Sequence, residues 1–181
     1  MAKNILITGG AASGKSRWAV TNFSACDYVL YLRAGDVVDA DTLNRIEFGN
    51  NKNGVEWDIV TGAKKDPASY IGDHKFVIFD SLGTYTSGII SEMCPDIANM
   101  DEEMRKLIEK RVISDITEMH DKIVDIQGSM IIITVETGFS VTPENRAQAL
   151  FREILGNVNQ RIANMSDEVY FSASGIQFKI K

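Results

Sequence analysis

Short apolar runs alternate with longer amphipathic segments along the 181 residues of this chain. Runs rich in Ile, Leu, Val and Phe are typical of strands buried on both faces of a sheet. They predict strands at residues 5–7, 28–32, 76–80 and 129–135, an edge strand at 57–60, and a final pair at 168–173 and 176–180. The alternation of strands and helices predicts an α/β domain with a mainly parallel sheet flanked by helices on both faces. A tight turn at Ser174 and Gly175 joins the last two strands, so the C-terminal strand is expected to be antiparallel.

Apolar residues at helical spacing predict the helices between these strands. The first covers residues 16–23, with Trp18, Ala19 and Phe23 directed at the sheet. The longest covers residues 101–126 and carries one apolar stripe at a spacing near 3.6 residues. We interpret this stripe as core, and it comprises Met104, Ile108, Val112, Ile116, Met119 and Ile123.

Two further helices are indicated by their N-terminal residues. Asp39 can accept a backbone hydrogen bond as the N-cap of a short helix that carries Leu43 and Ile46. Thr142 is expected to cap another helix, with Pro143 at its first helical position. The buried face of that helix comprises Leu150, Ile154, Val158 and Ile162. We find no repeat and no linker, which predicts one domain over residues 1–181.

Composition and charge narrow the class of protein. The chain is 44% hydrophobic and 24% charged, as is usual for a globular domain. Its net charge of −6 argues against a nucleic-acid surface, which needs clustered Lys and Arg. Cys26 and Cys94 lack the spacing of metal ligands and are interpreted as reduced thiols of a cytoplasmic protein. The first strand lies so close to Met1 that no signal peptide is expected, and no apolar run reaches the length of a membrane span.

The strongest chemical signal directly follows the first strand. The sequence there has the spacing G-x-x-x-x-G-K-S of the phosphate-binding loop (P-loop), and it reads Gly9-Gly10-Ala11-Ala12-Ser13-Gly14-Lys15-Ser16. Glycines let the backbone N–H groups close around a phosphate, and the following helix adds its positive end. Lys15 is expected to reach the β- and γ-phosphates, and the Ser16 hydroxyl to bind Mg²⁺. This pattern predicts binding of a nucleoside triphosphate, either ATP or GTP.

A carboxylate is predicted beside this loop. The apolar run 76–80 ends in Asp80, the Walker B pattern that places an acid next to the magnesium ion in P-loop proteins. Glu136 follows the strand at 129–135 and is the best candidate for the base that accepts the proton of an attacking hydroxyl. A loop-capping role is its alternative. Arg146 is open to two interpretations, a phosphate or substrate contact and a structural salt bridge.

The order and spacing of several motifs resemble one family. The matching segments are Thr8–Gly10, Ser13–Arg17, Arg45–Ile46, Trp57, Pro143–Arg146, Gly156–Arg161, Asp167–Val169 and Ser174–Ile176, followed by Lys179 and Lys181. The chain is similar to adenosylcobinamide kinase / adenosylcobinamide-phosphate guanylyltransferase of cobalamin biosynthesis. The resemblance implies a RecA-like P-loop fold, a homotrimer, and a corrinoid substrate beside the nucleotide.

The same resemblance implies two reactions. A nucleoside triphosphate first phosphorylates the hydroxyl of the aminopropanol arm of adenosylcobinamide. GTP then donates GMP to that phosphate through a histidine that becomes guanylylated. In this chain Gly49 stands where the family pattern has that histidine, within residues 49–54, which we predict to be a polar loop. Glycine has no nucleophilic atom for this step.

Neither histidine of the chain is an evident replacement. His74 precedes the strand at 76–80 and His120 lies within a long helix, so both are predicted to be surface or boundary residues. Three interpretations therefore remain at this point. We favour a kinase without guanylyl transfer, because Lys15, Ser16 and Asp80 are all present. The alternatives are a bifunctional enzyme with another nucleophile and a nucleotide-binding paralogue without catalysis.

Overall fold

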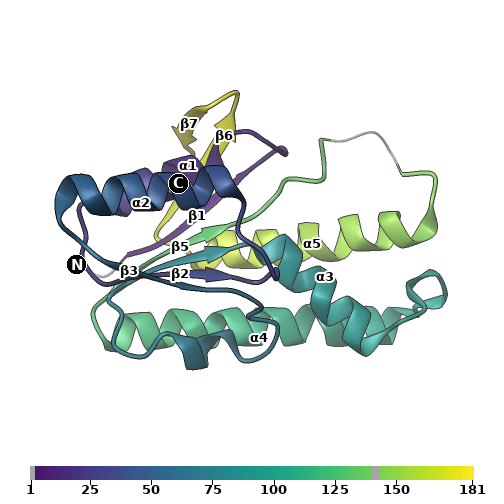
Figure 1. Cartoon of the computed structure of the whole chain (residues 1–181). Helices are drawn as coiled ribbons and strands as arrows, with labels where there is room; N and C mark the ends of the chain where they lie inside the picture. The colour runs from purple at the N-terminus through teal and green to yellow at the C-terminus, as the bar shows by residue number, and fades with distance from the viewer. Residues whose placement is uncertain (1–2, 140–142) are drawn as a thin grey trace.

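The computed structural model describes residues 3–139 and 143–181 (Figure 1). Its centre is a seven-stranded sheet with the order β3-β2-β4-β5-β1-β6-β7. The strands are β1 (Lys3–Gly9), β2 (Val29–Arg33), β3 (Trp57–Val60), β4 (Phe76–Asp80), β5 (Ser129–Ile133), β6 (Glu168–Ala173) and β7 (Ile176–Lys179). All pairings are parallel except that of β6 with β7. The predicted sheet, its edge strand at 57–60 and its antiparallel C-terminal strand are thereby confirmed.

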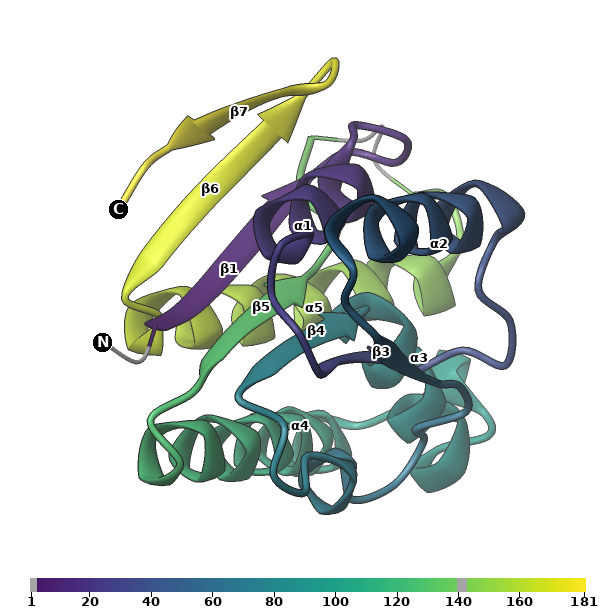
Figure 2. The same cartoon turned by 60° about the vertical axis from the view of Figure 1, so that its left-hand side comes forward.

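Helices cover both faces of this sheet (Figures 1 and 2). They are α1 (Lys15–Phe23), α2 (Ala40–Asn53), α3 (Leu82–Met93), α4 (Glu102–Asp125) and α5 (Arg146–Met165), with short 3-10 helices at Pro67–Tyr70 and Ile97–Asn99. Helices α1 and α2 pack on one face, whereas α3, α4 and α5 pack on the other. Two apolar layers therefore enclose the strands, and the P-loop lies between β1 and α1.

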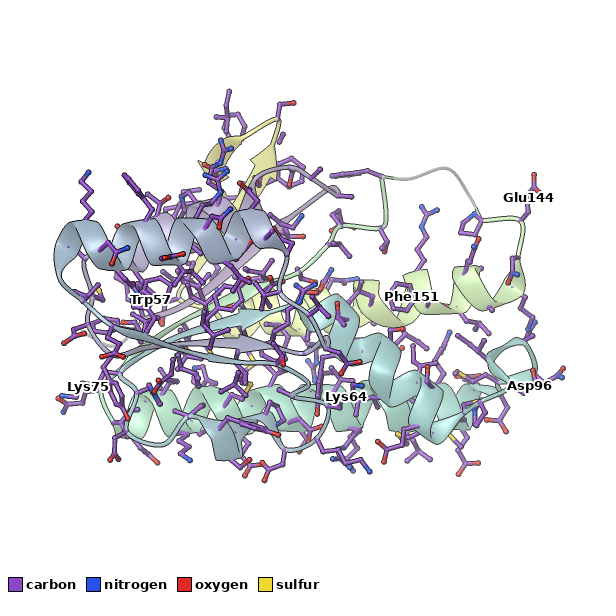
Figure 3. The ribbon with its side chains drawn as sticks, viewed as in Figure 1. Trp57, Lys64, Lys75, Asp96, Glu144 and Phe151 are labelled. Atoms are coloured by element: carbon purple, nitrogen blue, oxygen red, sulfur yellow. The ribbon has the colours of Figure 1, made fainter. Side chains whose placement is uncertain are left out.

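Each layer is built from the predicted apolar positions. Five of the six residues in the predicted α4 stripe are fully buried, and Met104 is half-buried against the same cluster. On the opposite face, Ala19 and Phe23 of α1 pack with Trp57 and Ile46. Figure 3 shows Trp57 on the side of the sheet that α2 covers, where its indole N–H donates to the Cys26 carbonyl at 3.1 Å.

Helix starts agree with the sequence where a side chain caps them locally. The Asp39 carboxylate accepts from the Thr42 N–H at 2.9 Å, as predicted. The predicted start of the last helix was wrong, because α5 begins at Arg146 with Asn145 as its N-cap. The Asn145 side chain accepts from the Ala147 N–H at 2.7 Å. Thr142, the cap that we expected, lies outside the described residues.

The predicted loop at 49–54 was also wrong, because α2 continues to Asn53. The Asn53 amide donates to the Ser24 carbonyl at 2.8 Å, and this contact with the end of α1 supports the last turn of α2. Only Gly54, with φ of 65°, has the left-handed conformation that we expected more widely in this segment. Helix α3 was not predicted, although its N-cap Ser81 accepts from the Thr84 N–H at 3.3 Å.

Strand register brings the predicted chemistry to one edge of the sheet. Asp80 ends β4 and is paired with Ile133 of β5, which is in turn level with Ile7 of β1. On its other side, Asp80 is paired with Arg33, the last residue of β2. The carboxyl ends of four neighbouring parallel strands therefore meet beside the P-loop that follows β1.

Candidate phosphate-binding site

The P-loop is folded around the side chain of Lys15. The ammonium group donates to the Gly9 carbonyl at 3.0 Å, to the Gly10 carbonyl, and to the Ser13 hydroxyl at 3.3 Å. Lys15 is buried, and this burial lowers the pKa of its ammonium group, while the negative charge of Asp80 counteracts the shift. The side chain is therefore held at the loop, within the electrostatic reach of Asp80.

The start of α1 offers backbone donors for an anion. Gly14 is its N-cap, with φ of 95° and without a side chain that could cap the first turn. The first N–H groups of a helix lack intrahelical partners and favour an anion. Of the other predicted P-loop residues, Ala11 and Ala12 are exposed, and Ser16 lies half-buried in the first turn of α1. This arrangement suits a phosphate group.

The C-terminal hairpin supports the P-loop from behind. The Ser172 hydroxyl of β6 donates to the Ser13 carbonyl at 2.7 Å, and the Gly175 N–H donates to the same oxygen at 3.0 Å. The Gln177 amide donates to the Ser172 hydroxyl at 3.1 Å. Sequence reasoning did not find these supporting residues, because they lie about 160 residues from the loop in the chain. Their only sequence signal was the Ser174–Gly175 turn.

Asp80 is almost completely buried and is held by two donors. The Tyr31 hydroxyl and the guanidinium group of Arg33 both contact its Oδ2 atom, the latter through Nη1 at 2.7 Å. Tyr31 is fully buried, and burial together with the nearby negative charge of Asp80 raises the pKa of its hydroxyl, which thus stays a donor. Neither partner was singled out from the sequence.

The donor set fits magnesium. Asp80 and Ser16 supply carboxylate and hydroxyl oxygens, the hard ligands that Mg²⁺ prefers. Among residues 3–139 and 143–181, no cluster of three or more His, Cys, Asp or Glu side chains could hold a metal by itself. Because Mg²⁺ is commonly held by one or two protein ligands together with substrate phosphates, these two residues match the role.

Glu136 lies next to the P-loop, as its predicted role requires. Its N–H donates to the Gly9 carbonyl at 3.1 Å, and its carboxylate accepts from the Gly138 N–H at 2.8 Å. The side chain therefore also caps its own loop, the alternative that we considered from the sequence. Glu136 lines a cavity of about 430 Å³ together with residues that include Arg152 and Gln160. This cavity lies between the loop that follows β5 and helix α5.

Arg146 and His74 make structural contacts in this fold. Arg146 donates to the Met100 carbonyl at 3.4 Å, a structural contact. His74 is buried, so its predicted surface or boundary position was wrong. Its ring contacts the Asp58 carboxylate and the Ile71 carbonyl, each at 2.8 Å.

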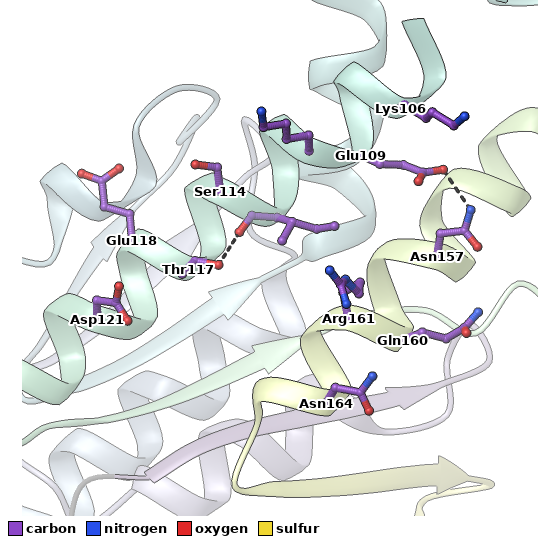
Figure 4. Close-up of a pocket in the computed structure, with 12 residues that line it drawn as sticks. Lys106, Glu109, Ser114, Thr117, Glu118, Asp121, Asn157, Gln160, Arg161 and Asn164 are labelled. Carbon is purple, nitrogen blue, oxygen red and sulfur yellow. Dashed lines mark hydrogen bonds between the residues drawn. The ribbon is translucent and has the colours of Figure 1, made fainter. Parts of the chain in front are cut away.

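A larger groove of about 990 Å³ runs between α4 and α5, away from the P-loop (Figure 4). Eleven of its twelve lining residues are polar or charged, and the Asn157 amide donates across it to Glu109 at 2.9 Å. It shares Asn157 and Gln160 with the cavity beside Glu136. The two hollows therefore adjoin along α5.

Comparison with known proteins identifies the family. The family model described as cobinamide kinase / cobinamide phosphate guanyltransferase matches residues 5–180. The chain belongs to this family. It is 29% identical over 180 residues to the bifunctional adenosylcobalamin biosynthesis protein CobU of Escherichia coli, with 98% of this chain and 99% of the relative covered. The Salmonella typhimurium protein of the same name is 30% identical over 183 residues, with the same coverage. The resemblance of the chain to this family, stated from its motifs, is thereby confirmed.

Solved structures agree on the fold at low sequence identity. An ATP synthase subunit from Nanoarcheaum equitans superimposes with a TM-score of 0.56 at 10% identity, covering 94% of this chain and 45% of the subunit. An ATPase of the bacterial type III secretion system gives 0.54 at 11% identity, covering 94% and 52%. A KaiC-like protein from Pyrococcus horikoshii gives 0.50 at 15% identity, covering 93% and 71%. These likenesses support the P-loop fold and carry no statement about substrate.

Proposed function

We propose that this chain is a kinase that transfers the γ-phosphoryl group of ATP or GTP to the aminopropanol hydroxyl of adenosylcobinamide. Family membership supports the substrate, since the family is that of cobinamide kinases. The observation that carries the phosphoryl transfer is the convergence of Lys15, Asp80 and Glu136 at one edge of the sheet. Phosphoryl transfer depends mainly on positioning and on neutralising charge, and these residues supply both.

In this proposal each residue has one role. The N–H groups of the P-loop and of the first turn of α1 bind the phosphates, while Lys15 moves from its own loop carbonyls to the β- and γ-phosphates. Ser16 and Asp80 hold Mg²⁺, which when bound neutralises phosphate charge. Glu136 accepts the proton of the substrate hydroxyl. At the same time the hydroxyl oxygen bonds to the γ-phosphorus and the nucleoside diphosphate leaves.

We further propose that guanylyl transfer through a histidine is absent. Gly49 lies near the end of α2, where a side chain would face Ser24 at the far end of α1. The nine residues of α1 extend about 13 Å from the P-loop. His74 precedes β4, whose opposite end carries Asp80, so the length of that strand separates it from the phosphate site. His120 lies on α4 and contacts Asp121 at 3.0 Å.

We propose that the protein is cytoplasmic. Cys26 and Cys94 are free thiols, which supports a cytoplasmic protein. None of the helices in the described part of the chain is long and apolar enough to cross a bilayer. The homotrimer that the resemblance implies remains a prediction, which analytical ultracentrifugation of the purified protein would test.

The test is mass spectrometry of adenosylcobinamide after incubation with the protein, Mg²⁺, ATP and GTP. We expect the phosphorylated corrinoid without its GDP derivative. Lys15→Ala should abolish the product, whereas Lys65→Ala, which removes an exposed lysine paired with Glu92 at 3.0 Å, should not. Formation of the GDP derivative would indicate a bifunctional enzyme with another nucleophile. Unchanged substrate would contradict the kinase and favour a nucleotide-binding protein without catalysis.

A further inference from the structure

Arg33 is the last residue of β2, and strand register places it directly beside Asp80 at the end of β4. Its Nη1 atom lies 2.7 Å from Asp80 Oδ2, and the two side chains are 25% and 5% exposed. The Nε–H of Arg33 donates to the Val37 carbonyl at 3.2 Å, which fixes the guanidinium group from the other side. This ion pair is therefore largely shielded from water and is anchored at both ends.

The second donor to Asp80 does not alter its charge. Tyr31 lies two residues before Arg33 on the same face of β2, and its neutral hydroxyl contacts the same Oδ2 atom. Arg33 is the cation in direct contact with Asp80, since the Lys15 ammonium is engaged by P-loop oxygens. The buried carboxylate is thus neutralised by Arg33.

Binding of a magnesium–nucleotide complex requires the Asp80 carboxylate to act as a ligand of Mg²⁺ as well as the partner of Arg33. A carboxylate that is paired with a partly buried guanidinium group is a weaker ligand for a metal ion, because the two cations repel each other at short range. Without Arg33, the same buried carboxylate would repel the phosphates of a metal-free nucleotide. Arg33 therefore weakens Mg²⁺ binding at Asp80 and strengthens the binding of metal-free nucleotide, and both effects reduce the dependence of nucleotide binding on magnesium.

We propose that Arg33 is the resident counter-ion of Asp80 and competes with Mg²⁺ for this carboxylate, which sets the magnesium dependence of nucleotide binding. The inference rests on the proposed function only in taking Asp80 as the magnesium-binding carboxylate. Arg33 is a positioning residue in this scheme, because it acts on the nucleotide through Asp80. Its release from Asp80 accompanies loading of the site.

The experiment measures the affinity of a fluorescent ATP analogue in EDTA and across a Mg²⁺ titration, without any corrinoid. In Arg33→Ala the half-saturating Mg²⁺ concentration should fall about fivefold, and metal-free nucleotide should bind about fivefold more weakly, as expected for loss of one partly buried ion pair. Arg33→Lys retains a cation beside Asp80 and should move both values less than Arg33→Ala does. Arg111→Ala removes another paired arginine, 2.8 Å from Asp115 on α4, and should leave both values unchanged.

A double-mutant cycle assigns the effect to Asp80. In an Asp80→Asn background, Arg33→Ala should no longer change the magnesium dependence. The same shift in that background, or no shift in Arg33→Ala, would overturn the proposal. If Arg33→Ala fails to fold, Arg33→Gln keeps the length of the side chain without its charge and should give the same shift.

The outcome is separable from that of the kinase test. A magnesium shift in a protein that leaves adenosylcobinamide unchanged would overturn the proposed function and support this inference. Phosphorylation of the corrinoid without a magnesium shift would support the proposed function and overturn this inference. A wild-type protein that binds no nucleotide at any Mg²⁺ concentration would overturn both.

Discussion

The Ser172 hydroxyl donates a hydrogen bond to the Ser13 carbonyl at 2.7 Å and so ties the C-terminal hairpin to the phosphate-binding loop. The bond is buried, and the Gly175 N–H reinforces it by donating to the same oxygen. A carbonyl that is held from behind cannot turn toward the phosphate, which leaves the loop N–H groups facing the ligand. The last strands of the fold therefore preorganise its first motif.

We expect Ser172→Ala to reduce nucleotide affinity about threefold to tenfold and to lower the free energy of unfolding by about 1 kcal/mol, the usual value of one hydrogen bond. Titration with a fluorescent nucleotide and urea unfolding would measure the two effects. Ser91→Ala is the control, because the Ser91 hydroxyl donates to the Ser87 carbonyl at 2.9 Å on the exposed side of α3. Equal nucleotide affinity of the two variants would contradict a role of the hairpin in shaping the loop.

The two adjacent glycines of the P-loop should respond very differently to alanine. Gly9 has φ of 146°, and a Cβ there would lie 2.2 Å from the Ser172 carbonyl oxygen, whereas a Cβ at Gly10 would meet nothing within 4 Å. Gly9→Ala should therefore lower the free energy of unfolding by about 3 kcal/mol, through strain and displacement of β6. Gly10→Ala should change it by less than about 0.5 kcal/mol. Thermal unfolding of both variants checks this contrast, and similar losses would refute it.

Local signals account for much of what the sequence predicted correctly. The Asp39 cap depends on the next three residues, and the Ile108–Ile123 stripe depends only on the period of one helix. The segment from Gly49 to Asn53 was mistaken for a loop because its poor helix formers are compensated by packing against α1, which a local pattern does not contain. Tertiary contact thus decided that segment.

The candidate site also combines parts that a local motif predicts with parts that depend on tertiary structure. The P-loop and Asp80 could be predicted because each is a short motif attached to a strand. The pairing of Arg33 with Asp80 depends on strand order and register, since β2 and β4 are adjacent in the sheet although other elements separate them in the chain. A charged residue at the end of an apolar strand was the available signal, and it becomes meaningful once the strand order is known.

Glu168 should make the stability of the fold depend on pH at its acidic end. Hydrogen bonds from Lys3 and Lys179, at 2.7 Å and 2.9 Å, lower the pKa of its carboxyl from 4.5 to about 2. Because the folded pKa is below the unfolded one, this stabilisation is complete above about pH 4.5 and is lost as the pH falls toward 2. Both lysines are half-exposed, so we expect a contribution of only about 1 kcal/mol.

Unfolding of wild type and Glu168→Gln by urea at several pH values would measure this contribution. The variant should be less stable by about 1 kcal/mol at pH 7, and the difference should shrink between about pH 4.5 and pH 2. A difference that stays constant over this range would show that the loss comes from packing rather than from the charge of Glu168.

His74 should be a structural residue without a part in phosphoryl transfer. Its ring contacts the Asp58 carboxylate of β3 and the Ile71 carbonyl, each at 2.8 Å, and stacks on Tyr28 with ring centroids 4.1 Å apart. His74→Ala removes these contacts from a buried position and should lower the free energy of unfolding by about 2–3 kcal/mol.

His120→Ala, on the half-exposed side of α4, is the control and should lower the free energy of unfolding by less than about 0.5 kcal/mol. Below the unfolding temperature, both variants should keep the nucleotide affinity and the phosphorylation rate of the wild type, because neither ring lies at the edge of the sheet that carries Lys15 and Asp80. A stable His74→Ala protein that has lost phosphoryl transfer would instead assign this histidine to the reaction.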